Sequence, residues 1–452
     1  MITKKLAEFV ANLEYKELPA EVVARSKDAV IDYLSAVIAG YKEGNILSRN
    51  IIQMVKNIGG KKESTVFGLG EKVPMINAAL ANGVLSHVVE LDDGHRIALG
   101  HPGVTTITAA LAAGEYLQAS GRELVTAAVA GYDVFVRIAS AINPSHLTLG
   151  FHTTGTCGAF SAAAAASKMF KLDDEQTANA LGLAGIQGAG LMEVTEDGQM
   201  AKALHVGKAA QAGILAALLA KKGAEGPKTI IEGNKGFAKA MSDGCDFELI
   251  LDDLGKEYKI LSCYIKPYPS CRHTHAPIDA ILALRREEDF SLEDIKEIVI
   301  KTYPAAISLT GHIFRPKTTA AAKFSIPYCV CAALVDGEVG LKQFKPDRLT
   351  APEILKMTDK VKVEVDPATE KVNPRIRGAE VQILLKNGKP LKKRVDLPKG
   401  EPEHPLTSEE LREKFEYCTE GIFENNKLNE IMNSINNIDE MDNINELINL
   451  LK

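Results

Sequence analysis

The chain has 452 residues, more than one ordinary domain contains, so its length predicts two or three domains. Lysine and arginine number 53 against 59 aspartates and glutamates, and the net charge of −6 excludes a nucleic-acid-binding protein that relies on a broad basic surface. Aromatic residues make up only 6% of the chain and tryptophan is absent, so small and aliphatic side chains must form the core, which favours packed helices.

The cysteines and the apolar segments bear on the cellular compartment. Seven cysteines are scattered without a Cys-x-x-Cys pair, which is typical of free thiols in a reducing compartment. The amphipathic N-terminal segment carries Glu8 and has no continuous apolar core, so we do not expect a signal peptide. The longest apolar run, near 212–220, is too short to span a bilayer. We therefore expect a cytoplasmic protein with no membrane partner.

Up to about residue 260, apolar residues recur at helical spacing in one segment after another. Pro19 and the pair Asp173-Asp174 are typical of helix starts. Alanine-rich stripes in several segments indicate helices that are buried on more than one side. The segments expected to be helical are 22–38, 104–117, 123–142, 158–169, 175–186 and 208–219.

From about Lys266 the pattern changes to the alternation of apolar and polar residues that is typical of strands. Two such segments flank Asn387-Gly388, which predicts a β-hairpin. Strands are expected at 297–302, 361–365, 381–385 and 391–395, and helices at 352–357 and after Lys323.

These patterns predict a mainly α fold. A large all-helical domain covers 1–265, a smaller α+β lid domain covers 266–400, and C-terminal helices over 401–452 return to the helical domain. The asparagine-rich tail has the biased composition of a disordered segment, but its apolar residues at helical spacing favour docked helices. These residues are Leu428, Ile431, Ile435 and Ile438.

Six of the ten histidines fall in four polar motifs. The first motif runs from Glu90 to Arg96, contains Asp92 and Asp93, and is followed by His101. Carboxylates, imidazoles and a guanidinium in a loop between two helical segments are typical of catalytic groups. An exposed capping loop before the next helix is an equally good interpretation of this motif taken alone.

The second motif places His152 before a glycine- and threonine-rich turn at a helix start, where it could face a ligand. For a lone histidine, a hydrogen-bonded core position is the more common alternative. The glycines do not follow the G-x-G-x-x-G pattern and no strand precedes them, which excludes a dinucleotide-binding fingerprint.

The third motif contains Lys202 and His205, which share one face if the segment is helical. A lysine that enters an alanine-rich, buried helix needs a partner for its ammonium group. An anionic substrate would serve as this partner. The alternative is a structural ion pair with Glu193, Glu196 or Asp197.

The fourth motif lies at the expected domain junction and contains Lys266, Arg272, His273 and His275. These cationic groups are typical of a carboxylate or phosphate clamp. A zinc site is a weaker interpretation, because His-x-His supplies two ligands and no Cys-x-x-Cys completes the set. Further along, Tyr328 could donate a proton, although a tyrosine at a helix start more often serves packing.

Taken together, the motifs resemble the MmgE/PrpD family, which includes 2-methylcitrate dehydratase, cis-aconitate decarboxylase and iminodisuccinate epimerase. The matching features are LDDGHR with HPG, GFHTTGTCG, GQMAKALHVGKAA, IKPYPSCRHTH, and RP with AKFSIPY, in family order. The resemblance implies a homodimer, a helical domain with a smaller α+β lid, and a substrate pocket between them. It also implies catalysis without a metal or organic cofactor.

The resemblance also assigns roles by position. It implies that the catalytic residues are Asp92, His101, His152, Lys202, Lys266 and Tyr328. The residues expected to bind substrate are Asp93, Arg96, His205, Arg272, His273 and His275. Family members commonly place threonine shortly after the acidic pair, whereas this chain has Gly94-His95-Arg96, which leaves the choice of reaction open.

Family members act on small di- or tricarboxylates, so the site must hold carboxylates and move a proton at a neighbouring carbon. Fixed cations suit the first task, and His101 suits the second because imidazole titrates near neutral pH. Asp92 would orient His101 or act as the base itself. His152 and Tyr328 would donate a proton to a leaving hydroxide or to a developing carbanion.

Our first expectation is a cofactor-independent hydro-lyase that resembles 2-methylcitrate dehydratase. The first alternative is an epimerase or decarboxylase of the same family, of the iminodisuccinate or cis-aconitate type. A non-catalytic protein that binds small acids is a second alternative, and a metal-dependent lyase using His273 and His275 is a third.

Overall fold

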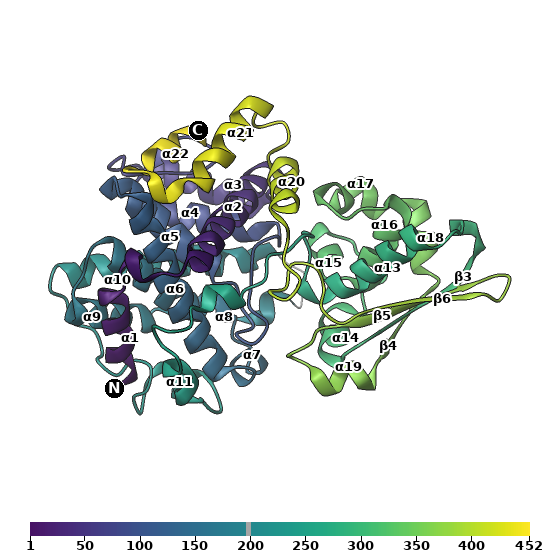
Figure 1. Cartoon of the computed structure of the whole chain (residues 1–452), viewed down its shortest axis with the longest axis horizontal. Helices are drawn as coiled ribbons and strands as arrows, with labels where there is room; N and C mark the ends of the chain where they lie inside the picture. Colours follow the sequence, from purple (N-terminus) through teal and green to yellow (C-terminus); the bar gives the residue numbers. More distant parts are fainter. Residues whose placement is uncertain (196–199) are drawn as a thin grey trace. The chain divides into compact units, whose positions relative to one another are not determined.

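The computed structural model describes residues 1–195 and 200–452. The chain forms two compact units, the first comprising Met1–Ile265 with Thr407–Lys452 and the second comprising Lys266–Leu406 (Figure 1). The second unit extends past the expected boundary at residue 400, because Glu401 accepts hydrogen bonds from Arg272 inside that unit. The mainly α fold with a small sheet is confirmed, and all seven cysteines are free thiols.

Buried helices with small residues at their contacts form the centre of the first unit. A Cβ added at Gly83 would lie 2.8 Å from the Cα atom of Gly207, and one at Gly213 would lie 2.4 Å from the Ala162 Cβ. The alanine- and glycine-rich stripes therefore let neighbouring helix axes approach closely, as the composition predicts. These central helices are α4 (Met75–Val88), α5 (Gly103–Leu117), α6 (Gly121–Ile142), α8 (Thr153–Met169) and α10 (Ala203–Lys221).

Helix α8 begins at Thr153, earlier than the expected residue 158. Gly150 lies in a turn, but Gly155 is part of the helix. Gly155 allows a close contact, since a Cβ at this position would lie 2.5 Å from the Ala189 carbonyl oxygen. Asp173 caps α9 (Asp174–Gly185) as predicted, because its side chain accepts a hydrogen bond from the Gln176 amide at 2.8 Å.

The remaining elements of the first unit surround this centre. By length and composition alone, α6 and α10 could cross a membrane, but most of each helix is buried within the unit, which explains their apolar sequences. The further helices are α1 (Ile2–Asn12), α2 (Ala20–Glu43), α3 (Ile46–Ile58), α7 (Ser145–Thr148), α11 (Phe237–Met241) and α12 (Phe247–Leu251). A small hairpin joins β1 (Ser64–Thr65) to β2 (Lys72–Val73).

The second unit contains a four-stranded sheet in the order β4-β3-β5-β6. Only β3 and β4 run parallel, and the β5–β6 hairpin turns at Gly388, whose φ of 87° suits glycine. The strands are β3 (Ile295–Thr302), β4 (Val361–Val365), β5 (Ala379–Leu385) and β6 (Pro390–Val395). The helices are α13 (His275–Glu287), α14 (Pro304–Thr310), α15 (Thr319–Lys323), α16 (Ile326–Asp336), α17 (Pro346–Leu349), α18 (Pro352–Thr358) and α19 (Pro367–Val372).

The C-terminal segment returns to the first unit as α20 (Ser408–Thr419), α21 (Asn425–Asn436) and α22 (Asn445–Leu450), drawn in yellow (Figure 1). The prediction of docked helices is confirmed, because the apolar stripe of the asparagine-rich tail is buried. The tail also meets the start of α6, where the Gly121 amide donates to the Met441 carbonyl oxygen at 2.9 Å.

We expect the substitution Gly121→Ala to loosen this tail. The added Cβ would lie 1.5 Å from the Ile438 carbonyl oxygen, so the backbone of the tail would have to move. Overpacking of this kind costs about 1–3 kcal/mol. Hydrogen exchange of residues 425–452 should become faster than in the wild type, together with a lower Tm. Unchanged exchange in this segment would contradict the role of Gly121.

Candidate active site

A buried cluster of titratable side chains lies in the first unit, where the end of α4 meets the starts of other central helices. Carboxylates come from the loop after α4, and imidazoles come from α4 itself, from the loop before α5, from the N-cap of α8 and from α10. The members of this cluster are His87, Glu90, Asp92, His101, His152, Lys202 and His205.

Asp92 is shared by two imidazoles. Its Oδ2 atom lies 2.8 Å from the Nδ1 atom of His87 and 3.2 Å from the Nδ1 atom of His101. The Nδ1 atom of His101 also contacts the carbonyl oxygen of Asp93, which can only accept a hydrogen bond. In the neutral imidazole the proton therefore sits on Nδ1, and the Nε2 atom of His101 carries the lone pair that general base catalysis needs.

Lys202 is the N-cap residue of α10 and is almost fully buried. Its Nζ atom forms an ion pair with Oε1 of Glu90, a residue whose left-handed φ of 58° is unusual outside glycine. Glu90, the partner of Lys202, belongs to the first motif. Of the partners considered from the sequence, Glu196 and Asp197 lie outside the described residues.

His152 and His205 face each other with their Nδ1 atoms 3.1 Å apart, so one ring must donate and the other accept. Burial is the largest cause that lowers the pKa of His152 well below its usual value, and the charge of Lys202 adds to it. Burial also lowers the pKa of His205. Both rings are therefore neutral near pH 7. One ring can then donate a hydrogen bond to the other without adding positive charge to the cluster.

Asp93 holds the loop in place through two hydrogen bonds of its carboxyl group. One oxygen accepts a hydrogen bond from the Tyr132 hydroxyl at 2.6 Å, and the other accepts from the Gly103 amide at 3.1 Å, at the start of α5. Burial and the neighbouring charge of Asp32 raise the pKa of Asp93 to about 8. The structure therefore gives Asp93 a structural role, and its expected substrate-binding role stays a prediction.

The raised pKa of Asp93 predicts a pH-dependent stability. Because the folded-state pKa of Asp93 is about 8, the folded chain holds this proton up to about pH 8, whereas the unfolded chain releases it near the ordinary aspartate pKa of 3.8. The stabilisation is complete at low pH and is lost as the pH rises through about 8. The Tm of Asp93→Asn relative to the wild type should therefore increase between pH 5 and 8. A constant difference would contradict the assignment.

Arg96 lies in a tight loop and is half-buried. Two short bridges close this loop, one between Gly94 and Tyr264 and one between His95 and Gly100. The His95 ring also stabilises this loop, because its Nδ1 atom accepts a hydrogen bond from the Ala98 amide at 3.0 Å. The sequence Gly94-His95-Arg96 therefore builds a defined loop beside the cluster.

In the second unit, Arg272 forms its hydrogen bonds with other residues of the same unit. Its Nε and Nη2 atoms donate to Oε1 of Glu401 at 3.1 and 2.9 Å, and the remaining N–H groups reach the carbonyl oxygens of Pro398 and Lys399 and the Nδ1 atom of His275. A guanidinium has five N–H donors, and all of them have acceptors here. A substrate carboxylate would have to displace one of these bonds, by which Arg272 holds the 398–401 loop in place.

Two more expected groups of the second unit have partners inside it. The Tyr328 hydroxyl donates to the Gln343 carbonyl oxygen at 2.5 Å within the hydrophobic core, and burial raises its pKa. These contacts favour the packing interpretation of Tyr328, and its proton-donor role stays a prediction. His273 bonds to the Tyr303 hydroxyl, and burial lowers its pKa to about 3. Lys266 is fully buried at the start of the unit.

The sequence therefore identified five members of the cluster in the first unit, and two members were given no role. His87 ends an otherwise apolar, buried helix, and its spacing of five residues to Asp92 was the available signal. Glu90 was part of the first motif, but nothing in its local sequence indicates a pair with Lys202.

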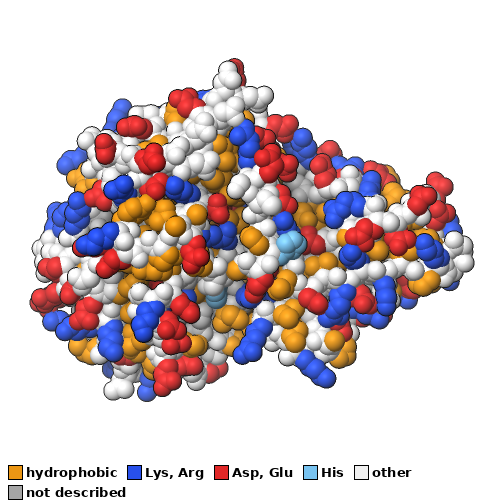
Figure 2. All heavy atoms as spheres, viewed as in Figure 1, with side chains coloured by type: hydrophobic (Ala, Val, Ile, Leu, Met, Phe, Trp, Pro, Cys, Tyr) orange, Lys and Arg blue, Asp and Glu red, His pale blue; other side chains and the backbone are white. Residues whose placement is uncertain are grey.

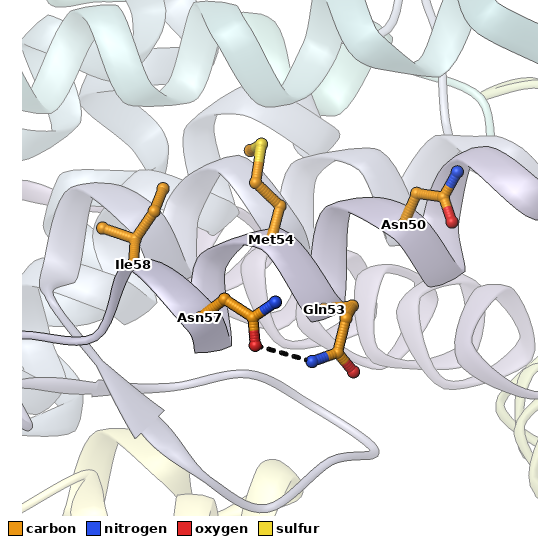
Figure 3. A pocket seen from close by; sticks show the side chains of 5 residues that line it. All are labelled: Asn50, Gln53, Met54, Asn57 and Ile58. Carbon is orange, nitrogen blue, oxygen red and sulfur yellow. Dashed lines mark hydrogen bonds between the residues drawn. The ribbon is translucent and has the colours of Figure 1, made fainter.

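Two features of the surface do not indicate a second catalytic site. Asn50, Gln53, Met54, Asn57 and Ile58 line a pocket on α3, where the Gln53 and Asn57 amides form a 2.8 Å hydrogen bond (Figure 3). None of these lining groups transfers a proton near neutral pH. On the face drawn in Figure 2, acidic and basic side chains are interspersed, in keeping with the absence of a broad basic surface there.

Comparison with known proteins agrees with this architecture. The cis-aconitate decarboxylase of Aspergillus terreus is 27% identical over 472 residues, which cover 100% of this chain and 96% of the relative. The Mus musculus and Homo sapiens cis-aconitate decarboxylases are 26% and 27% identical, cover 100% of this chain, and are themselves covered to 93% and 94%. The MmgE/PrpD N-terminal domain matches residues 4–250, and the MmgE/PrpD C-terminal domain matches residues 268–440. The chain belongs to the MmgE/PrpD family of enzymes.

Proposed function

We propose that this protein is a decarboxylase that acts on cis-aconitate or a closely similar small tricarboxylate. The observation that carries the proposal is the Asp92–His101 pair, in which a buried carboxylate fixes the imidazole with Nε2 available for proton transfer. The buried Lys202 supplies positive charge in the same cluster. The relatives named above are cis-aconitate decarboxylases, and the similarity to this chain extends over at least 93% of each of them. This supports the choice of substrate.

The chemistry needs one proton. When a carboxylate leaves as CO₂, its bonding electron pair stays on the carbon, and a proton must be added there. A protonated His101 would donate this proton from Nε2 and recover one from water afterwards, and the charge of Asp92 would stabilise the imidazolium form. Lys202, held in place by Glu90, would attract a substrate carboxylate.

Dehydration of 2-methylcitrate, our first expectation from the sequence, stays a prediction. It would use the same proton donor, because a leaving hydroxide also takes up one proton. An epimerase would need an acid and a base on opposite faces of one carbon. The names of the relatives favour the decarboxylase alternative over both.

The test offers cis-aconitate, 2-methylcitrate, citrate and iminodisuccinate to the wild-type protein separately in D₂O. We expect CO₂ release from cis-aconitate alone, with one deuterium on a carbon of the product detected by NMR. Loss of water from 2-methylcitrate would instead identify a dehydratase, and deuterium exchange of iminodisuccinate without net conversion would identify an epimerase. No reaction with any of the four acids would overturn the proposal.

A further inference from the structure

His87 occupies an unusual position for a buried histidine. It stands at the last turn of α4, its side chain is fully buried, and its Nδ1 atom lies closer to Asp92 than that of His101 does. The two rings are in edge contact, with centroids 5.0 Å apart. Among the described residues, the Nε2 atom of His87 has no hydrogen-bond partner.

This Nε2 atom lies 3.9 Å from Oε1 of Glu90, beyond hydrogen-bond distance, and a buried polar atom left without a hydrogen bond destabilises the fold, so packing alone does not account for this imidazole. A second observation points the same way. Asp92 and His101 would form a complete pair by themselves, yet the Oδ2 atom of Asp92 that His101 uses also accepts from His87. His87 therefore competes directly with His101 for one carboxylate oxygen.

We infer that His87 is a positioning residue that fixes Asp92 and limits the proton affinity of His101. A carboxylate that already accepts one N–H stabilises a second, protonated imidazole less strongly than a carboxylate with a single partner. His101 then releases its proton to carbon more readily. The inference rests on the proposed function for its catalytic meaning, but the competition for Asp92 exists without any substrate.

Among the described residues, the other charged or titratable groups around Asp92 and His101 are Glu90 and Asp93 on the loop after α4, Asp32 of α2 with its partner Lys414 of α20, His152 before α8, and Lys202 and His205 at the start of α10. The variants below change none of them. A shift in the titration of His101 can therefore be assigned to the loss of the His87 donor.

The experiment compares His87→Leu with His87→Asn. Leucine removes both ring nitrogens, whereas the asparagine amide places an N–H donor near the Nδ1 position and keeps the bond to Asp92. Ser86→Ala is the matched control, since Ser86 is equally buried in the last turn of α4 and bonds only to Gly83 within the helix. If the leucine variant does not fold, His87→Met removes the same donor with a more adaptable side chain.

The titration midpoint of His101 is read by NMR from labelled histidine, without substrate. In His87→Leu we expect this midpoint to rise by about one pH unit, because Asp92 then serves His101 alone. Because the protonated form of His101 is the active one, the high-pH limb of the rate profile should move in the same direction. His87→Asn and Ser86→Ala should stay close to the wild type.

Two results would overturn the inference. One is a lower Tm in His87→Leu with an unchanged His101 midpoint, which a purely structural role would give. The other is an equal shift in His87→Asn, which would show that the donor to Asp92 is not the cause. If the wild type turns over none of the acids, the proposed function fails, while the NMR titration still decides the role of His87.

Discussion

Replacing His101 with glutamine is expected to lower kcat on cis-aconitate by roughly 10²–10⁴-fold. Glutamine keeps a polar side chain of similar reach, but it cannot carry the proton that the reacting carbon requires. Because His101 lies on a loop and its side chain is 15% exposed, the fold should survive, with a Tm close to that of the wild type. Initial rates of CO₂ release measure the effect.

Asp92→Asn is the companion variant, because it removes the charge that stabilises the His101 imidazolium. Residues that act as one unit show non-additive losses, so the double variant should be no slower than the slower single variant. Rates of His101→Gln within threefold of the wild type would remove His101 from the mechanism. Fully additive losses would show that Asp92 and His101 act independently.

Replacing Lys414 with methionine is expected to lower the free energy of unfolding by about 3–5 kcal/mol. The Nζ atom of Lys414 pairs with Asp32 and also donates to the Leu91 carbonyl oxygen at 2.9 Å, and both charged side chains are almost fully buried. Methionine would leave the Asp32 carboxylate buried without its cation. Chemical denaturation of the whole chain at pH 7 measures the loss.

The double variant Asp32→Asn with Lys414→Met is the control, since it removes both charges together. It should recover most of the lost stability, because a buried pair costs less to remove than to break. Asp32 also accepts a hydrogen bond from the Asp93 amide at 3.0 Å, so Lys414→Met should reduce activity by loosening the loop that carries Asp92. A Lys414→Met variant as stable as the wild type would contradict this account.

Local patterns predicted most of the elements. Helix α6 covers Gly121–Ile142 against the expected 123–142, and the strand over 361–365 appears with its expected ends. The start of α8 was misplaced because glycines that serve close packing resemble a turn in the sequence. Within the site, five predicted residues of the first unit came together, namely Asp92, His101, His152, Lys202 and His205, whereas the Tyr328 hydroxyl donates to a carbonyl oxygen in the core of the second unit.

The sequence by itself determined the helical core, the position of the α+β segment and the residues from which the site is built, because periodicity and motifs are local properties. Only the tertiary structure decided the partners. Lys414 pairs with Asp32, which lies 382 residues away in the sequence, and Asp93 accepts a hydrogen bond from Tyr132 of α6. His87 and His101 both contact Asp92. These pairings depend on how the helices pack, and hydrogen-bond geometry over such separations leaves no trace in the spacing of residues along the chain.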